Sequence, residues 1–103
     1  MFRYQIIIEY DGTNYSGWQS QTNAKSIQKE IEIILSKILK TKVNVSGSGR
    51  TDAGVHSKNQ SAHFDHKKYI TNKYKFISTA NFFLNKKNIK IKKIVNKNTN
   101  FRA

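Results

Sequence analysis

The chain of 103 residues contains no cysteine and no proline. Without cysteine, disulfides and cysteine-ligated metal sites are excluded. Its apolar runs are short, such as Ile6 to Ile8, whereas a helix needs about 20 apolar residues to cross a bilayer. The N-terminus also lacks the basic and apolar regions of a signal peptide. We therefore expect a single small domain that is soluble and cytoplasmic.

Acidic residues are scarce, with six Asp and Glu against nineteen Lys and Arg and a formal net charge of +13. Such an excess favours a polyanionic partner, nucleic acid above all. The alternative is compositional drift, because a chain rich in Lys, Asn and Ile without Pro is typical of an AT-rich genome. The ten lysines from Lys67 to Lys97 fit either phosphate contacts or a solvated face.

The first half of the chain changes its hydrophobic period once. Alternation from Arg3 to Tyr10 predicts a strand that is buried on one face. A polar, turn-rich loop follows at Asp11-Gly12. The spacing of Ile27, Ile31, Ile34 and Ile38 then predicts an amphipathic helix that begins after an N-cap at Ser26.

The second half predicts two further strands, a helix and an edge strand. The ranges are Val43 to Ser46, Gln60 to Asp65, Thr71 to Leu84 and Asn88 to Val95. The apolar side of the second helix is expected to comprise Tyr74, Phe76, Ile77, Ala80, Phe83 and Leu84. The order β-α-β-β-α-β predicts an α+β, ferredoxin-like fold. Because this fold carries many unrelated functions, the site must identify the activity.

The stretch SGSGRTDAGVHS, Ser46 to Ser57, places one of the scarce carboxylates, Asp52, among three glycines. One interpretation is a turn between strands in which Asp52 caps local backbone donors. The other is a functional loop. Glycines there permit close approach of a ligand, Arg50 could hold phosphate, and an ionised carboxylate is a competent nucleophile.

The segment GSGRTDAGVH closely resembles the active-site motif of the tRNA pseudouridine synthase A family. YDGTNYSGWQSQ, SIQKEIEIIL and NQSAHFD are similar to that family's other segments, in its order and at its spacing. The resemblance implies a cofactor-free isomerisation of uridine to pseudouridine in the anticodon stem-loop of tRNA. The target base leaves its stack to be reached, and its attachment moves from N1 to C5.

Asp52 matches the family's catalytic aspartate, which would attack either the ribose C1′ or uracil C6. Arg50 matches the arginine that engages RNA near the flipped nucleotide, and its charge should help to keep Asp52 ionised. Thr51, Gly54, Val55 and His56 would shape the loop around nucleotide and carboxylate. The resemblance also implies tRNA as partner, homodimerisation, and neither metal nor membrane.

Members of the family are well over twice as long, with two pseudo-symmetric halves around the RNA cleft. The tyrosine that stacks on the target uracil and the basic residue that pairs with the catalytic aspartate belong to parts with no match here. We therefore expect residues 1–103 to be the N-terminal α/β half of a catalytic domain whose C-terminal half is absent. By itself this half would be an incomplete catalyst.

Three further features leave alternatives. Trp18 and Tyr15 could stack on RNA bases, or Trp18 could pack its loop onto the sheet. His63 and His66 are three residues apart, yet no third ligand accompanies them and we expect no metal site. A non-catalytic RNA-binding module on the same scaffold is the competing function, although the strand pattern QSAHFD lacks the basic and aromatic run of an RNA-recognition motif.

Overall fold

Strands and helices follow one another along the chain in the predicted order, β-α-β-β-α-β. The computed structural model describes residues 1–21 and 24–103. The elements are β1 (Phe2–Tyr10), α1 (Ile27–Leu39), β2 (Ser46–Gly47), β3 (Ser57–His66), α2 (Lys73–Leu84), the 3₁₀ turn η1 (Asn85–Lys87) and β4 (Ile89–Lys97). Within these described ranges no helix has the length and apolarity to cross a membrane.

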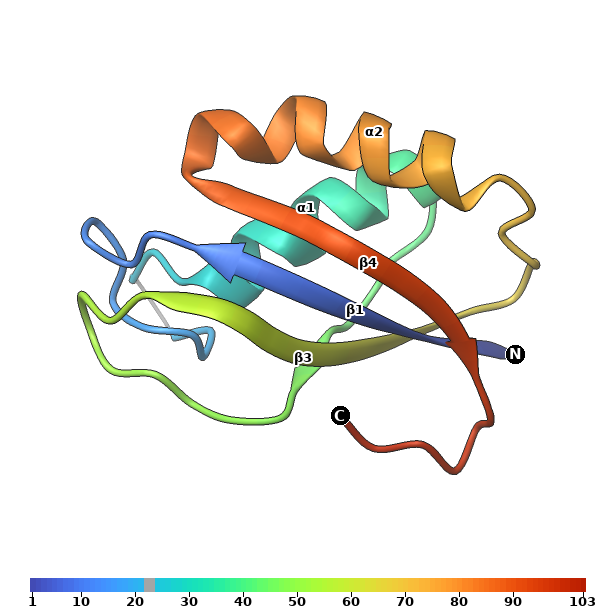
Figure 1. Ribbon diagram of the computed structural model, residues 1–103, viewed down its shortest axis with the longest axis horizontal. Helices are drawn as coiled ribbons and strands as arrows, with labels where there is room; N and C mark the ends of the chain where they lie inside the picture. Colours follow the sequence, from blue (N-terminus) through green and yellow to red (C-terminus); the bar gives the residue numbers. More distant parts are fainter. Residues whose placement is uncertain (22–23) are drawn as a thin grey trace.

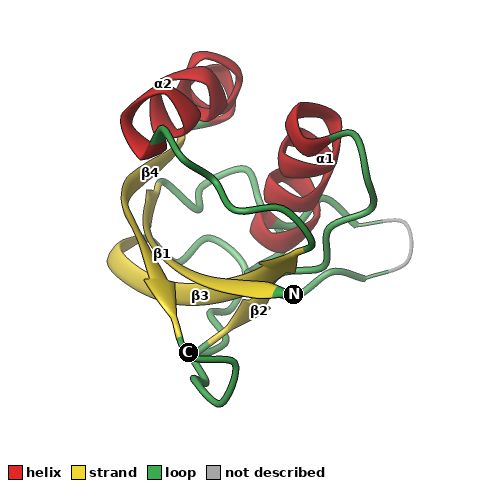
Figure 2. Ribbon diagram, turned by 90° about the vertical axis from the view of Figure 1, so that its right-hand side faces the viewer, coloured by secondary structure: helices red, strands yellow, loops and turns green. Residues whose placement is uncertain are grey.

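The strands form one antiparallel sheet in the order β2-β3-β1-β4. Both helices cover the same face of this sheet, and the other face is open (Figures 1 and 2). β1 pairs with β3 from Phe2↔His66 to Tyr10↔Ser57 and with β4 on its other side. The predicted α+β, ferredoxin-like arrangement is thereby confirmed.

The core lies between the sheet and the helices, and the predicted alternation in β1 produces it. Tyr4, Ile6 and Ile8 are fully buried, while Arg3 and Glu9 point to the open face. From α1 the predicted isoleucine stripe and Leu35 pack against them. The helix begins as predicted, because the Ser26 side chain accepts a hydrogen bond from the Lys29 N–H at 3.2 Å.

The predicted strand from Val43 to Ser46 is wrong for most of its length, because β2 contains only Ser46 and Gly47. Val43 and Val45 are buried as a strand pattern requires. Their backbone groups, however, bond to side chains of α1. The Val43 N–H donates to the Ser36 hydroxyl at 2.9 Å and the Val45 N–H to the Glu32 carboxylate at 2.8 Å. Helix side chains therefore replace a strand partner here.

The other predicted boundaries differ by a few residues. α2 begins at Lys73, with Asn72 as its N-cap, and β3 extends beyond the predicted range at both ends. Tyr74 was expected on the apolar side of α2 but is 84% exposed. The buried stripe instead comprises Phe76, Ala80 and Leu84. Residues three or four apart share a face of a helix, so position 74, two residues before Phe76, lies outside this stripe.

The C-terminal residues 98–103 curl back over the open face of the sheet, near β3 (Figure 1). The Arg3 guanidinium donates to both carboxylate oxygens of Asp65, at 2.8 and 3.0 Å, and to the Phe101 carbonyl at 2.7 Å. The Ala103 N–H donates to Nδ1 of His63 at 3.2 Å. These contacts give the open face a polar, hydrogen-bonded surface.

Two strand histidines make the stability of the fold sensitive to mild acid. Burial, with Lys67 and Lys68 nearby, lowers the pKa of His66, whose Nδ1 has no partner among the described residues. Burial and the Arg3 charge lower the pKa of His63, against an opposing effect of Asp65. The unfolded chain therefore binds more protons than the folded one below about pH 6.5.

We expect the free energy of unfolding to fall as the pH is lowered from 7.5 to 5.5. Asp11 and Asp65 do not oppose this trend, because their lowered pKa values keep them ionised in that range. Urea denaturation at the two pH values measures the effect, and His66→Gln should reduce it. A free energy of unfolding that stays constant or rises on acidification would contradict the assignment.

Candidate active-site loop

The segment that carries Asp52 connects β2 to β3, and residues 48–56 are named here the Asp52 loop. Two hydrogen bonds attach its first residues to β3. The Ser48 N–H donates to the Ser61 carbonyl at 2.8 Å, and the side-chain amide of Gln60 donates to the Gly49 carbonyl at 2.6 Å. Gln60 is only 8% exposed, so this anchor lies largely out of water.

A second loop, which begins at Asp11 after β1 and runs through Trp18, contacts the Asp52 loop from the other side. The Trp18 N–H donates to the Thr51 carbonyl at 3.1 Å, and the Gly54 N–H donates to the Tyr15 carbonyl at 3.2 Å. The hydroxyls of Tyr10 and Thr51 are hydrogen-bonded at 2.9 Å. The backbone is therefore fixed immediately before Asp52 and two residues after it.

Two glycines of that second loop make this close approach possible. A Cβ atom at Gly12 would lie 1.9 Å from the Val55 carbonyl oxygen, and one at Gly17 would lie 2.4 Å from the Thr51 carbonyl oxygen. Gly17 also has a φ of +106°, which L side chains rarely adopt. Any side chain at either position would separate the two loops.

The Asp52 loop turns sharply at its tip. The Val55 N–H donates to the Asp52 carbonyl at 3.2 Å, and Gly54, at the third position of this turn, has a φ of +80°. A type II turn requires positive φ at that position. The backbone carbonyl of Asp52, rather than its carboxylate, thus closes the turn. The hydrogen bonds from local backbone donors to the Asp52 carboxylate, which a purely structural turn would have, are not formed among the described residues.

The Asp52 side chain is exposed, and its carboxylate makes no hydrogen bond or ion pair with any described residue. Arg50 is exposed as well and takes no part in the ion pairs of residues 1–21 and 24–103. A rigid loop therefore presents a carboxylate and a guanidinium to solvent. Such an arrangement suits groups that act on a bound ligand.

His56, at the end of the loop, contacts the residues that follow β1. Its Nδ1 accepts a hydrogen bond from the Gly12 N–H at 2.9 Å and lies 3.1 Å from the Asp11 carboxylate. The two contacts exclude each other. Nδ1 must be unprotonated to accept the hydrogen bond from Gly12, and it must carry a proton to donate to Asp11. Hydrogen bonds from the Thr13 side chain and backbone, with a smaller contribution from His56, lower the pKa of Asp11.

A sequence model described as tRNA pseudouridine synthase matches residues 6–101, a span that includes both loops. The chain belongs to this family. It is 56% identical over 103 residues to the tRNA pseudouridine synthase A of Pelagibacter ubique, covering all of this chain and 42% of that protein. It is 45% identical over 92 residues to the tRNA pseudouridine synthase A of Neorickettsia sennetsu, covering 89% of this chain and 38% of that protein.

A third relative, the tRNA pseudouridine synthase A 1 of Protochlamydia amoebophila, is 59% identical over 71 residues, which are 68% of this chain and 28% of that protein. The resemblance found in the sequence is therefore confirmed at the level of the family. The chain spans about two fifths of the length of the first two relatives.

Within this synthase fold, the aromatic residues of the second loop have a packing role. Trp18 is 3% exposed and Tyr15 5% exposed. The indole of Trp18 lies where a Cβ atom at Gly47 would meet it at 2.6 Å, and the Tyr15 hydroxyl donates to the Lys87 carbonyl. Of the two interpretations of Trp18, packing of the loop onto the sheet is the one observed.

His63 and His66 lie on opposite faces of β3, since strand side chains alternate and the two are three residues apart. His63 faces the open side, where it meets Phe101 and Ala103. His66 is buried. Among the described residues no three His, Asp or Glu side chains gather in a way that could hold a metal ion.

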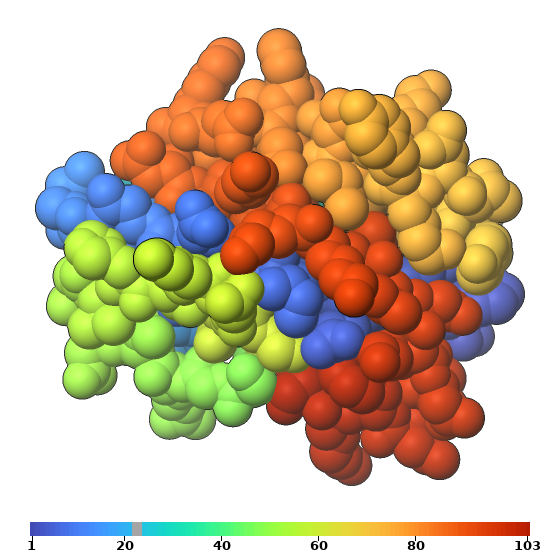
Figure 3. Space-filling model, in the orientation of Figure 1, coloured from blue at the N-terminus to red at the C-terminus, as the bar shows by residue number. Residues whose placement is uncertain are grey.

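Positive charge is concentrated in the last third of the chain. No Asp or Glu follows Asp65, whereas residues 66–103 include ten lysines and Arg102. In Figure 3 this segment, from gold to red, covers the upper and right-hand parts of the visible face. Among residues 1–21 and 24–103, two of its lysines form ion pairs, Lys87 with Glu30 and Lys92 with Glu9. Most of this charge therefore remains available to a polyanion.

Sequence reasoning found the Asp52 loop but missed the residues that hold it. Tyr10, Gly12 and Gly17 belong to the family-like segment YDGTNYSGWQSQ, but the sequence predicts for them only a strand end and a turn, with no contact to the Asp52 loop. The signal that could have found them is the pair of glycines within one short loop, at Gly12 and Gly17. Such spacing suggests that another backbone passes close by.

Proposed function

We propose that the chain supplies the catalytic aspartate, Asp52, of an isomerase that converts uridine to pseudouridine in the anticodon stem-loop of tRNA. Family membership supports the reaction class. The observation that carries the residue assignment is an exposed carboxylate on a backbone fixed on both sides. A preorganised nucleophile of this kind lowers the reorganisation needed in the transition state.

The chemistry needs no redox step. If the Asp52 carboxylate attacks C1′, an ester forms as the C1′–N1 bond breaks and its electron pair leaves with uracil. The freed uracil turns, and C5 attacks C1′ and displaces the carboxylate. The C5 proton is then lost and N1 gains a proton, so product and substrate have the same atoms. Attack at uracil C6 forms an adduct instead and leads to the same product. A carboxylate suits a centre that develops positive charge.

The remaining residues of the loop are assigned supporting roles. Arg50 would hold RNA phosphate near the flipped nucleotide. Thr51, Gly54 and Val55 shape the loop through their contacts with Tyr10, Tyr15 and Gly12. For His56, the hydrogen bond from Gly12 supports a role in holding the loop rather than in moving a proton.

We further propose that residues 1–103 form the N-terminal half of a catalytic domain that acts on tRNA in the cytoplasm as a homodimer. Residues matching the family's C-terminal half would contribute the stacking tyrosine and the cation for Asp52. Support comes from the relatives, in which the matched region is 42% and 38% of the length.

A non-catalytic RNA-recognition module is less well supported. Such modules stack bases on aromatic residues of their central strands. The central strands here are β1 and β3. Their open-face positions carry Arg3, Gln5, Ile7, Glu9, Ser61, His63 and Asp65. His63 carries the single aromatic ring in this set, and it is in contact with Phe101 and hydrogen-bonded by Ala103.

The test is tritium release from tRNA that carries C5-tritiated uridine. It uses the chain by itself and a chimera in which the chain replaces the matching part of the Pelagibacter ubique relative. Release by the chimera is expected, since the two sequences are 56% identical over 103 residues. A folded chimera that binds tRNA and releases no tritium would overturn the proposal.

A further inference from the structure

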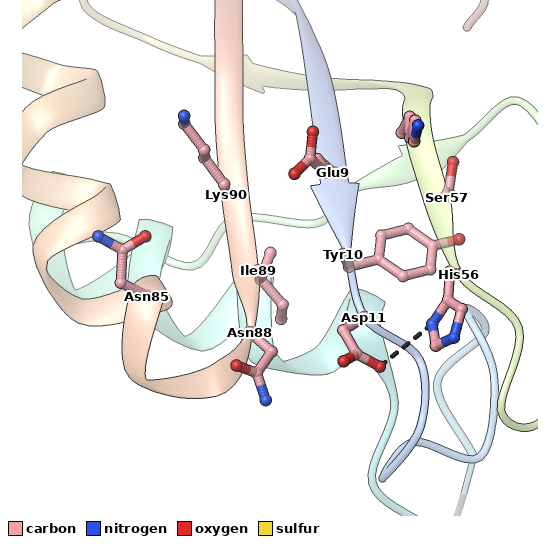
Figure 4. A pocket seen from close by; sticks show the side chains of 10 residues that line it. Glu9, Tyr10, Asp11, His56, Ser57, Asn85, Asn88, Ile89 and Lys90 are labelled. Atoms are coloured by element: carbon pink, nitrogen blue, oxygen red, sulfur yellow. Dashed lines mark ion pairs between the residues drawn. The ribbon is translucent and has the colours of Figure 1, made fainter.

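A hollow of about 450 Å³ lies beside the Asp52 loop, where β1 ends and β3 and β4 begin. Figure 4 shows Asn85 and Asn88 on one side of it and His56 and Ser57 on the other, with Tyr10 between them. Its volume falls within the range of about 300–1,000 Å³ that is usual for small-molecule sites. One molecule of nucleotide size can therefore occupy it.

The lining combines apolar surface with unused polar groups. The apolar part includes Tyr10 and Ile89, of which only a small fraction, 3% and 1%, is exposed. Around them are side chains whose polar ends form no hydrogen bond or ion pair with other described residues: Ser57, Lys58, Asn85, Asn88 and Lys90. Apolar walls with a few convergent polar groups are the usual composition of a ligand site.

The charges of the hollow favour a ligand with two different ends. Lys58 and Lys90 are both exposed at its rim. Glu9 and Asp11 also line it, and Glu9 lies directly opposite Lys90 across the β1–β4 pair and 3.8 Å from the Lys92 ammonium. A simple anion would be repelled by these two carboxylates. A ribonucleotide offers a phosphate to the lysines and a 2′-hydroxyl that can donate to a carboxylate.

The hollow is also close to Asp52. The turn hydrogen bond from Val55 to Asp52 keeps the Cα atoms of these two residues within about 7 Å. His56, which lines the hollow, follows Val55 by one Cα–Cα step of about 3.8 Å. Asp52 therefore lies within about 11 Å of the wall, Cα to Cα, and one RNA strand can reach both places.

We propose that this hollow binds a nucleotide of the RNA that neighbours the nucleotide presented to Asp52. Its phosphate lies at Lys58 and Lys90, and the amides of Asn85 and Asn88 hydrogen-bond the base edge. The inference rests on the proposed function for the identity of the RNA. It adds a second nucleotide subsite and the residues that select it.

The test measures the affinity of the 103-residue chain for an anticodon stem-loop RNA by fluorescence anisotropy, at several salt concentrations. Lys90→Gln should weaken binding about 3- to 10-fold at 0.1 M salt. It should also reduce the steepness of log affinity against log salt concentration by the contribution of about one phosphate contact. Lys75→Gln is the matched control, because Lys75 is equally exposed on α2 and does not line the hollow. It should change the affinity less than twofold.

The amides are tested with the double variant Asn85→Ala/Asn88→Gly. Glycine suits position 88, whose φ is +61°, and the backbone hydrogen bonds of both residues are retained. We expect a loss of affinity of about fivefold or more. A double-mutant cycle is completed with two stem-loops, each with an abasic residue on one side of the target uridine. One of these stem-loops should bind the unchanged chain more weakly than the intact stem-loop does, and should show no such loss with the double variant.

Equal losses for Lys90→Gln and Lys75→Gln would show binding by diffuse charge and overturn the subsite. So would a double variant that binds as tightly as the unchanged chain, or a chain that binds no stem-loop while the chimera releases tritium. In these cases the proposed isomerase function stands. Loss of affinity confined to the hollow, together with an inactive chimera, would instead support the subsite and reject the function.

Discussion

Replacing Asp52 with asparagine is expected to abolish tritium release by the chimera, with a loss in rate of about 10⁴-fold or more. Asparagine has nearly the same shape but cannot act as the anionic nucleophile. The carboxylate makes no hydrogen bond or ion pair with other described residues, so no polar interaction of the fold depends on it. The effect on the free energy of unfolding should be no more than about 0.5 kcal/mol.

This separation of activity from stability makes Asp52→Asn informative. Asp52→Glu is the second variant, because it keeps the charge and moves it by one methylene group. On a loop anchored at Thr51 and Gly54, that displacement should also cost most of the rate. The assignment is wrong if Asp52→Asn retains tritium release close to that of the unchanged chimera while tRNA affinity is unaltered.

The architecture was predictable because its strongest signals are local. The isoleucine stripe of α1 and the alternation of β1 each show one period without interruption, and period determines which face is buried. Element order then limits the fold to few topologies. Membership of the family followed from a motif dense enough to be specific, the run from Gly47 to His56.

Prediction failed where side chains of the preceding helix decided the local structure. Val43 and Val45 alternate as a strand does, yet Ser36 and Glu32 of the preceding helix bind their backbone N–H groups. The sequence pattern indicates which side chains are buried, but it does not indicate which groups form hydrogen bonds with the backbone N–H and C=O groups. A strand and a hydrogen-bonded extended segment therefore look alike in sequence.

The same limit applies to the candidate site. Its carboxylate was identified from the motif, but the supports that the Asp52 loop receives from the region of β1 are distant along the chain. Tyr10 is 41 residues from Thr51, and Gly12 is 44 residues from His56. The hollow joins residues from three strand ends. Nothing in the separate segments indicates that Asn85 and Asn88 would face His56.

Trp18→Ala is expected to have the largest effect on stability, because it removes a nearly buried indole, 3% exposed, from between its own loop and the sheet. Such truncations cost about 3–5 kcal/mol, which is a large part of the roughly 5–15 kcal/mol that stabilises a typical domain. The indole packs beside Tyr10, with ring centroids 6.2 Å apart, and against Gly47. Its loss should therefore also free the Asp52 loop.

Urea denaturation and hydrogen exchange at the amides of Trp18 and Gly54 measure the two consequences. The Trp18 N–H bonds to Thr51 and the Gly54 N–H to Tyr15, so both amides should lose protection before the strands do. Trp18→Phe keeps an aromatic ring in the space and should recover much of the stability. If Trp18→Ala leaves stability and protection unchanged but weakens stem-loop binding, the indole acts on RNA and does not serve to pack its loop onto the sheet.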